Sequence, residues 1–207
     1  MNLLAPLGRI AVLIVGLLAC APGHSAGFKM LVFGDSLSAA YRIDPDLGWV
    51  NQLRLRLAPR GMEVLNASIS GETTSGGASR ITQALDSHRP DLLILELGGN
   101  DALRGLKLDA SRQNLAYMIT SAMDRGAGVL LLGMQIPPNY GRAYTEAFFN
   151  MYGELAEQFG TALVPFFLEP VALSYELMQA DGIHPTEDAQ ALLLEHIWPV
   201  LSPLLPE

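Results

Sequence analysis

The run Leu92-Leu-Ile-Leu-Glu-Leu97 constrains the fold of this chain more than any other segment. It is short, nearly all apolar and followed by two glycines, which is typical of a central strand in a parallel sheet covered on both faces. Further strands are predicted for the short apolar runs at 29–33, 62–67, 129–132 and 161–164. Helices are predicted for the longer amphipathic segments between them, at 49–57, 78–87, 109–125 (with Asp109 as its cap), 144–159 and 187–201. This alternation predicts the α/β class: a single-domain, three-layer α/β/α fold with a five-stranded parallel sheet.

The N-terminal residues have the pattern of an export signal. Residues 1–9 carry one positive charge, and an apolar run to residue 20 follows that is shorter than the roughly 18–20 residues of a membrane span. We expect a signal peptide at 1–26, one domain at 27–207, a periplasmic location and no stable membrane span. Leu17-Leu-Ala-Cys20 also resembles a bacterial lipobox, so a lipoprotein anchored through Cys20 is the alternative.

Charge and cysteine content exclude several classes of function. All 21 acidic residues lie beyond residue 26, together with 12 of the 13 basic residues, so the mature chain has a net charge of −9. This excess of acids argues against nucleic acid and anionic membranes as partners. Cys20 is the only cysteine, which excludes an intrachain disulfide, a zinc–cysteine site and a cysteine nucleophile. We expect a monomer that acts on a small molecule.

Three predicted strands end in polar or glycine-rich segments. These are Gly34-Asp-Ser36, Ser68-Ile-Ser-Gly71 and Gly98-Gly-Asn-Asp101. In a parallel α/β sheet, ligands bind beyond the carboxyl ends of the strands, so the three segments should meet at one edge and form a site. Asp35 and Asp101 are interpreted as residues that brace these loops.

Ser36 is the candidate nucleophile, and it needs a base to remove its proton. His184 is the best candidate for that base, because Asp181 precedes it by three residues in a turn limited by Gly182 and Pro185. Such a turn allows the aspartate to reach one imidazole nitrogen and leaves the other free. The alternative is an ordinary turn in which Asp181 binds only backbone amides. The other histidines are interpreted as leader, helix-end and packing residues: His24, His88 and His196.

Attack on a carbonyl creates an oxyanion, which requires hydrogen-bond donors. Three donors are available in the loops: the Ser36 amide at the start of an expected short helix, the Gly71 amide and the Asn100 side chain. Each has a simpler explanation. Gly71 also suits a turn with positive φ, and Gly98-Gly99 suits a tight exit from a strand.

Taken together, Gly34-Asp-Ser-Leu37, the Gly71 loop, Gly98-Gly-Asn-Asp101 and Asp181-x-x-His-Pro185 resemble the SGNH hydrolases, also called the GDSL family. The resemblance covers nearly all of the chain beyond the leader. The segments that begin at Asn66, Leu97 and Gln135 look closest to the bacterial periplasmic thioesterase I/lysophospholipase L1/arylesterase subgroup. The common Gly-x-Ser-x-Gly elbow of other α/β hydrolases is absent, as expected for this family.

The resemblance implies a flavodoxin-like fold and a serine hydrolase that cleaves acyl esters and thioesters through an acyl-Ser36 intermediate. It implies a triad of Ser36, His184 and Asp181, an oxyanion hole of Ser36, Gly71 and Asn100, and no cofactor or metal. A metal-dependent phosphoesterase is disfavoured because only one histidine is placed as a ligand. A glycan-binding module with a dead site is disfavoured because every member of the triad is present.

The segment 165–180 is long, apolar and poorly periodic, which indicates a functional loop. Its apolar side chains are expected to line an acyl groove: Phe166, Phe167, Leu173, Leu177 and Met178. A carbohydrate O-acetylesterase of the same family is the alternative function, although a sugar site would have more exposed Trp, Asn and Asp. Part of this apolar set would serve to anchor the loop to the core.

Overall fold

The computed structural model describes residues 27–207, so the predicted signal peptide and Cys20 lie outside the described part. Five strands form one parallel sheet in the order β2-β1-β3-β4-β5. The strands are β1 (Lys29–Gly34), β2 (Glu63–Asn66), β3 (Leu92–Glu96), β4 (Gly128–Leu132) and β5 (Ala162–Val164). The α-helices of the described part are α1 (Trp49–Leu57), α2 (Thr74–His88), α3 (Gly99–Leu103), α4 (Leu108–Met123), α5 (Arg142–Phe159) and α6 (Gln190–Leu201). The predicted α/β fold is confirmed.

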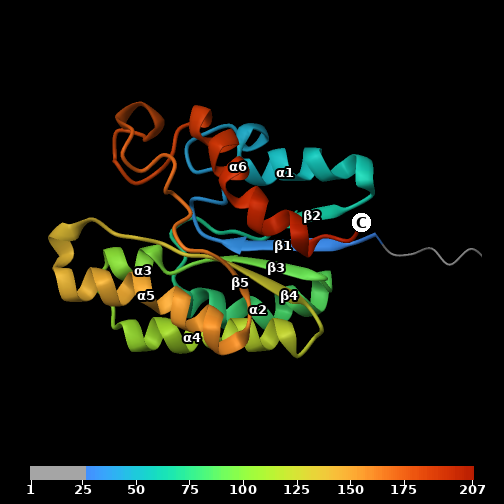
Figure 1. The fold of residues 1–207 in the computed structure, drawn as a ribbon, viewed down its shortest axis with the longest axis horizontal. Coiled ribbons are helices and arrows are strands. Elements are labelled where there is room, and N and C mark those ends of the chain that lie inside the picture. Colours follow the sequence, from blue (N-terminus) through green and yellow to red (C-terminus); the bar gives the residue numbers. More distant parts are fainter. Residues whose placement is uncertain (1–26) are drawn as a thin grey trace, which may run out of the picture.

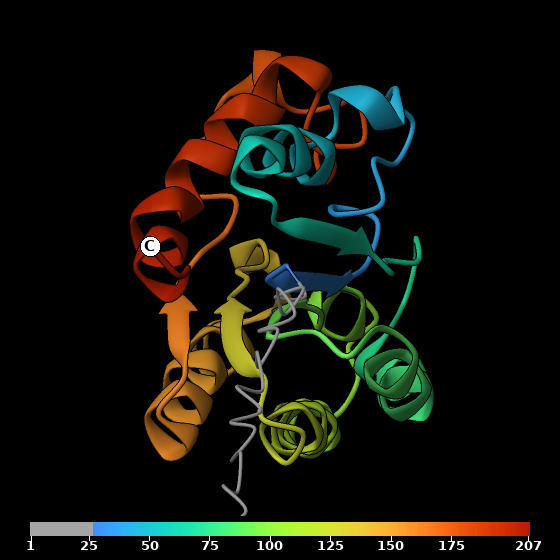
Figure 2. The ribbon, with the colours of Figure 1, turned by 90° about the vertical axis from the view of Figure 1, so that its right-hand side faces the viewer.

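Helices cover both faces of the sheet, as Figures 1 and 2 show. On one face α1 packs against α6, and on the other α2 packs against α4, which packs against α5. None of the helices in 27–207 has both the length and the apolar character that a membrane crossing needs. Crossover helices on both faces explain why the central strands are apolar throughout rather than alternating.

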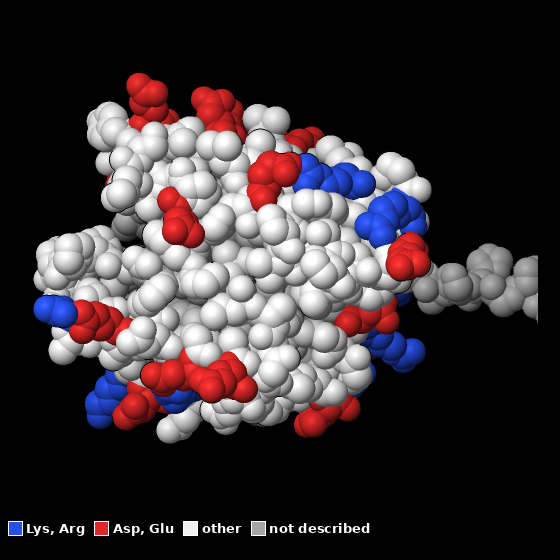
Figure 3. All heavy atoms as spheres, viewed as in Figure 1, with Lys and Arg blue, Asp and Glu red and all other residues white. Residues whose placement is uncertain are grey.

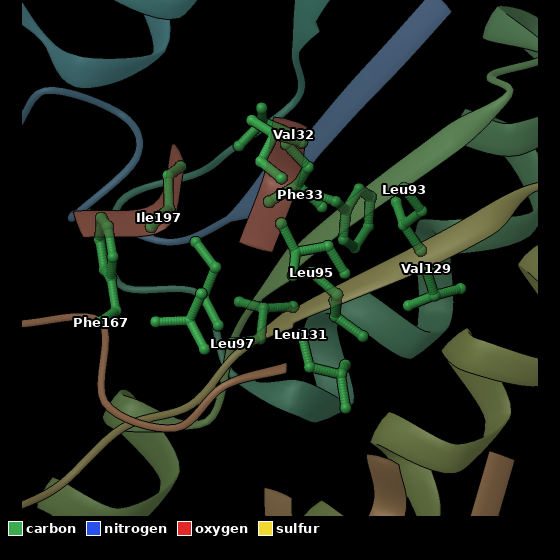
Figure 4. Close-up of a cluster of buried hydrophobic side chains, with 14 of the residues drawn as sticks. Val32, Phe33, Leu93, Leu95, Leu97, Val129, Leu131, Phe167 and Ile197 are labelled. Carbon is green, nitrogen blue, oxygen red and sulfur yellow. The ribbon is translucent and has the colours of Figure 1, made fainter. Parts of the chain in front are cut away.

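The centre of the sheet is β3, all five residues of which are buried. Leu93 pairs in register with Leu31 of β1 and Val129 of β4. Figure 4 shows these strands contributing Val32, Phe33, Leu93, Leu95, Val129 and Leu131 to one apolar cluster. Each fully buried side chain of this kind stabilises the fold by roughly 1.5–3 kcal/mol. The sheet is therefore a rigid base for the loops at its edge.

The helix predicted at 78–87 begins earlier, at Thr74. The Thr73 side chain accepts a hydrogen bond from the Gly76 amide and so caps the helix. Gly77 is needed inside the helix, because a Cβ there would lie 2.5 Å from Leu97 Cδ1. Gly76 and Gly77 lower the helix propensity of this first turn, so propensity does not predict it. Gly77 nevertheless allows α2 to approach the sheet closely.

Two further local predictions are wrong. Asp109 does not cap α4, which begins at Leu108 with Lys107 in the capping position, so Asp109 lies inside the first turn. Ser36 does not begin a helix either. It lies in successive turns, in which the Ala39 amide donates to the Asp35 carbonyl and the Tyr41 amide donates to the Ser36 carbonyl.

Candidate active site

The loops after β1 and β2 are joined at the carboxyl edge of the sheet. The Gly34 amide donates to Ser68 Oγ at 3.1 Å, and the Ile69 amide donates to the Gly34 carbonyl at 3.0 Å. The third segment, Gly98 to Asp101, does not remain a loop. It forms the start of α3 after Gly98, whose φ of +119° fits a tight strand exit.

The short helix α3 contacts both of the other segments. Asn100 Nδ2 donates to Asp35 Oδ2 at 2.9 Å, and the Arg104 guanidinium donates to the Gly71 carbonyl at 3.1 Å. The predicted meeting of three strand ends at one edge therefore agrees with the structure. Arg104 was not predicted to be a site residue, because nothing in the sequence distinguishes it from the other arginines.

Ser36, His184 and Asp181 form a continuous chain of hydrogen bonds. Ser36 Oγ lies 2.8 Å from His184 Nε2, and His184 Nδ1 lies 2.8 Å from Asp181 Oδ2. Asp181 Oδ1 also accepts from the Ile183 and His184 amides, each at 3.0 Å. Both interpretations of the Asp181 turn thus hold at once, since one carboxylate oxygen braces the turn and the other holds the imidazole.

These bonds keep Asp181 ionised. Burial acts to raise its pKa, but the hydrogen bonds from the His184 and Ile183 amides and from the imidazole outweigh burial and lower the pKa to about 2. An aspartate with this pKa accepts a proton only in strong acid. An ionised Asp181 facing Nδ1 favours a proton on that nitrogen, which would turn the lone pair of Nε2 toward Ser36 Oγ.

Each of the three proposed oxyanion donors keeps at least one N–H without an acceptor in the described residues. Within residues 27–207, neither the Ser36 amide nor the Gly71 amide donates to another protein group, and Asn100 Nδ2 uses one of its two N–H groups. Gly71 has a φ of +79°, so the turn at this position does require glycine, and the same residue carries the amide predicted to be a donor. The arrangement leaves three donors for an incoming oxygen.

Asp35 precedes the candidate nucleophile Ser36 and is 3% exposed. Its Oδ1 accepts from the Leu37 amide at 3.1 Å and lies 3.5 Å from Ser36 Oγ, while Oδ2 accepts from Asn100. Burial raises its pKa to about 6, against the opposing effect of the bonds from Leu37 and Asn100. Asp101 accepts instead from Thr74 and Ser111, so both aspartates brace the loops as expected.

Glu96 is a site residue that the sequence argument missed. It is fully buried at the end of β3, and its Oε2 accepts from the Asp35 amide at 3.2 Å and the Ser38 hydroxyl at 2.8 Å. Burial, together with the nearby Asp35, raises the pKa of Glu96 well above its usual value. The signal was available, since Glu96 is the one charged residue in an otherwise apolar strand.

The five residues predicted to line an acyl groove are spread over different environments. Phe167 is fully buried against Trp49, with ring centroids 5.5 Å apart, which corrects its assignment to the groove and makes it an anchor of the loop. Figure 4 shows it inside the core beside Ile197. Leu173 is fully exposed, whereas Phe166, Leu177 and Met178 are partly buried against the core.

The part of the chain that carries His184 is uniformly acidic. After Arg142 the sequence contains ten Asp or Glu residues and no Lys or Arg. Figure 3 shows acidic side chains along the upper part of one face, where Figure 1 places α6 and the loop before it. Over residues 27–207 no group of three His, Cys, Asp or Glu side chains is arranged to hold a metal.

The sequence of residues 32–192 matches the model of the GDSL-like lipase/acylhydrolase family. The chain belongs to this family. The match includes every triad and oxyanion-hole candidate, and members of this SGNH/GDSL family are carboxylic ester hydrolases, which makes the chain an ester hydrolase.

Individual relatives extend along nearly the whole chain. The chain is 51% identical over 199 residues to "Esterase TesA" of Pseudomonas aeruginosa, covering 94% of this chain and 99% of that one. It is 40% identical to "Thioesterase 1/protease 1/lysophospholipase L1" of Escherichia coli K12, covering 87% and 86%. The crystal structure of the esterase EstA from Pseudoalteromonas, "inhibited by monoethylphosphonate", matches with a TM-score of 0.81 at 33% identity, covering 84% and 97%.

Proposed function

We propose that this GDSL-family hydrolase cleaves acyl esters and thioesters through a covalent acyl-Ser36 intermediate. The observation that carries the proposal is the hydrogen-bonded chain from Ser36 through His184 to Asp181, with both links at 2.8 Å. Nε2 accepts the serine proton as Oγ attacks the acyl carbonyl, and it then returns that proton to the departing alkoxide or thiolate. Water hydrolyses the acyl-enzyme by the same steps in reverse order.

The oxyanion formed in each half-reaction is stabilised by the amides of Ser36 and Gly71 and by the Asn100 side chain. Two of these donors come from exposed or half-buried positions, so substrate can reach them. Loss of one such donor typically lowers kcat by about 10²–10³. The phosphonate inhibitor named for the EstA relative supports this assignment, because a phosphonate resembles the tetrahedral intermediate of acyl transfer.

The substrate class follows from the relatives and from the loop at 165–180. The relatives are named esterase, thioesterase and lysophospholipase. In the loop, Leu177 and Met178 are partly exposed and lie against the turn that carries His184, since the Thr186 amide donates to the Leu177 carbonyl and Met178 pairs with Pro185. Phe166, also partly exposed, lies farther along the loop, where its carbonyl is 2.9 Å from His196 Nε2. We assign a medium or long acyl chain to this side of the site. Residues 1–26 are proposed to direct export to the periplasm, with lipid attachment at Cys20 as the alternative.

The test is hydrolysis of p-nitrophenyl esters from acetyl to palmitoyl by the wild type and by Ser36→Ala, each with and without EDTA. The proposal expects turnover by the wild type alone, insensitivity to EDTA, and higher kcat/KM for the longer acyl chains. Activity that survives Ser36→Ala would overturn the mechanism. Turnover of the acetyl ester alone would favour a carbohydrate O-acetylesterase.

A further inference from the structure

The Asn100 side chain can serve the oxyanion in only one of its two orientations. A primary amide has a nitrogen that donates two hydrogen bonds and an oxygen that only accepts. Rotation by 180° about its last torsion exchanges the two ends at little cost, unless a neighbour distinguishes them. An oxyanion needs the nitrogen, so some group must hold the amide in that orientation.

Asp35 is the neighbour that distinguishes the two ends. Its ionised carboxylate can only accept, and its Oδ2 lies 2.9 Å from Asn100 Nδ2. A flipped Asn100 would place its oxygen against that carboxylate, and two acceptors facing each other with no donor between them repel. The bond to Asp35 uses one N–H of the amide and leaves the second without a partner in residues 27–207.

The carboxylate of Asp35 is itself held in place from two sides. Its Oδ1 accepts from the Leu37 amide at 3.1 Å, and the Asp35 amide donates to Glu96 Oε2 at 3.2 Å. Burial, and after it the charge of Asp35, raises the pKa of Glu96 well above its usual range, which favours a protonated Glu96 beside an ionised Asp35. Within the described chain Glu96 Oε1 makes no hydrogen bond, so the contacts of this carboxyl group with Asp35 and Ser38 are made through Oε2.

We propose that Asp35 is a positioning residue for catalysis, whose buried carboxylate orients the Asn100 amide so that its free N–H faces the oxyanion. This inference rests on the proposed function, in which Asn100 is an oxyanion donor. It goes beyond bracing of the loops, because it assigns to Asp35 an effect on the transition state that operates through one named side chain.

Asp35→Asn tests the assignment. The Leu37 amide still needs an acceptor, so the oxygen of the new amide stays at the Oδ1 position and its nitrogen faces Asn100 Nδ2. Two donors then meet, and Asn100 must flip its oxygen toward position 35, which removes the oxyanion donor. We expect kcat to fall about 10²–10³-fold with KM changed less than about threefold.

A double-mutant cycle separates this role from a general structural one. If Asp35 acts through Asn100, Asp35→Asn should lower kcat by less than about tenfold in an Asn100→Ala background. Asp101→Asn is the matched control, since it changes another buried aspartate that contacts Thr74 and Ser111, and its effect should multiply with that of Asn100→Ala. Wild-type kcat in Asp35→Asn, or a multiplicative double variant, would overturn the proposal.

The exchanged pair Asp35→Asn/Asn100→Asp gives a second, independent readout. The new amide at position 35 can donate to the new carboxylate at position 100, so the melting temperature should recover relative to Asp35→Asn. Because position 100 then offers no donor and the oxyanion keeps only the Ser36 and Gly71 amides, kcat should stay low. Recovery of kcat together with stability would reduce Asp35 to a structural brace. Ser36→Ala is measured in parallel, and its continued activity would refute the proposed function itself.

Discussion

Replacement of Asp181 by asparagine isolates the effect of the imidazole tautomer. Asp181 Oδ1 accepts from two backbone amides, so in Asp181→Asn the oxygen of the new amide must remain there. Its nitrogen then occupies the Oδ2 position, 2.8 Å from His184 Nδ1, and donates to it. Nδ1 cannot keep its proton in front of a donor, so the proton moves to Nε2 and blocks the nitrogen that serves Ser36.

The magnitude follows from this exchange. Loss of the correct tautomer by this substitution lowers kcat by about 10⁴ in a serine protease of known triad geometry, and a loss of about 10³–10⁴ is expected here. The assay is hydrolysis of p-nitrophenyl butyrate at pH 8 under saturating substrate. The turn keeps its two backbone bonds, so the melting temperature should stay within a few degrees of the wild type. A variant that retains more than a tenth of wild-type kcat would refute the tautomer argument.

Three further outcomes are expected. Because the pKa of Asp35 is raised to about 6 from 3.8, the folded state binds this proton more tightly, and the wild type loses stability as pH rises from about 4 to 6. The melting temperature of Asp35→Asn should fall less over the same pH range. An equal fall in the two proteins would contradict the assignment. Gly77→Ala should lower the free energy of unfolding by about 1–3 kcal/mol in urea titration, because its Cβ would overlap Leu97 and Met118. Phe167→Ala should cost about 3–5 kcal/mol, whereas Leu173→Ser should leave stability unchanged, and equal effects would contradict their different burial.

The strands were predictable because burial on both faces leaves an unmistakable apolar pattern. All five runs became strands, with no end shifted by more than one residue, and α1 matches its predicted range of 49–57. The two helix starts that the sequence did not predict share one cause. In the first turn of α2 and at the start of α3, glycine lowers helix propensity, yet close packing against Leu97 and the exit from β3 require it.

The site residues were predictable as types and positions, but not as a geometry. Ser36 and His184 are 148 positions apart in the sequence, and this separation does not give the distance between their side chains. The role of Glu96 was hidden for another reason. A single acid in an apolar strand indicates a buried carboxyl group. Only the fold places Glu96 against the turn at 35–38, where it accepts from the Asp35 amide and the Ser38 hydroxyl.

The absence of basic residues after Arg142 has a consequence for how each turnover ends. Hydrolysis converts a neutral acyl ester into a carboxylate, and the segment that carries Glu176, Asp181 and His184 has no cation to retain it. Repulsion from this segment therefore favours departure of the carboxylate product and opposes the attraction of Arg104, the cation that binds the Gly71 carbonyl. At 0.1 M salt such repulsion is screened beyond about 10 Å, so the acidic segment after Arg142 should speed product release most at low ionic strength.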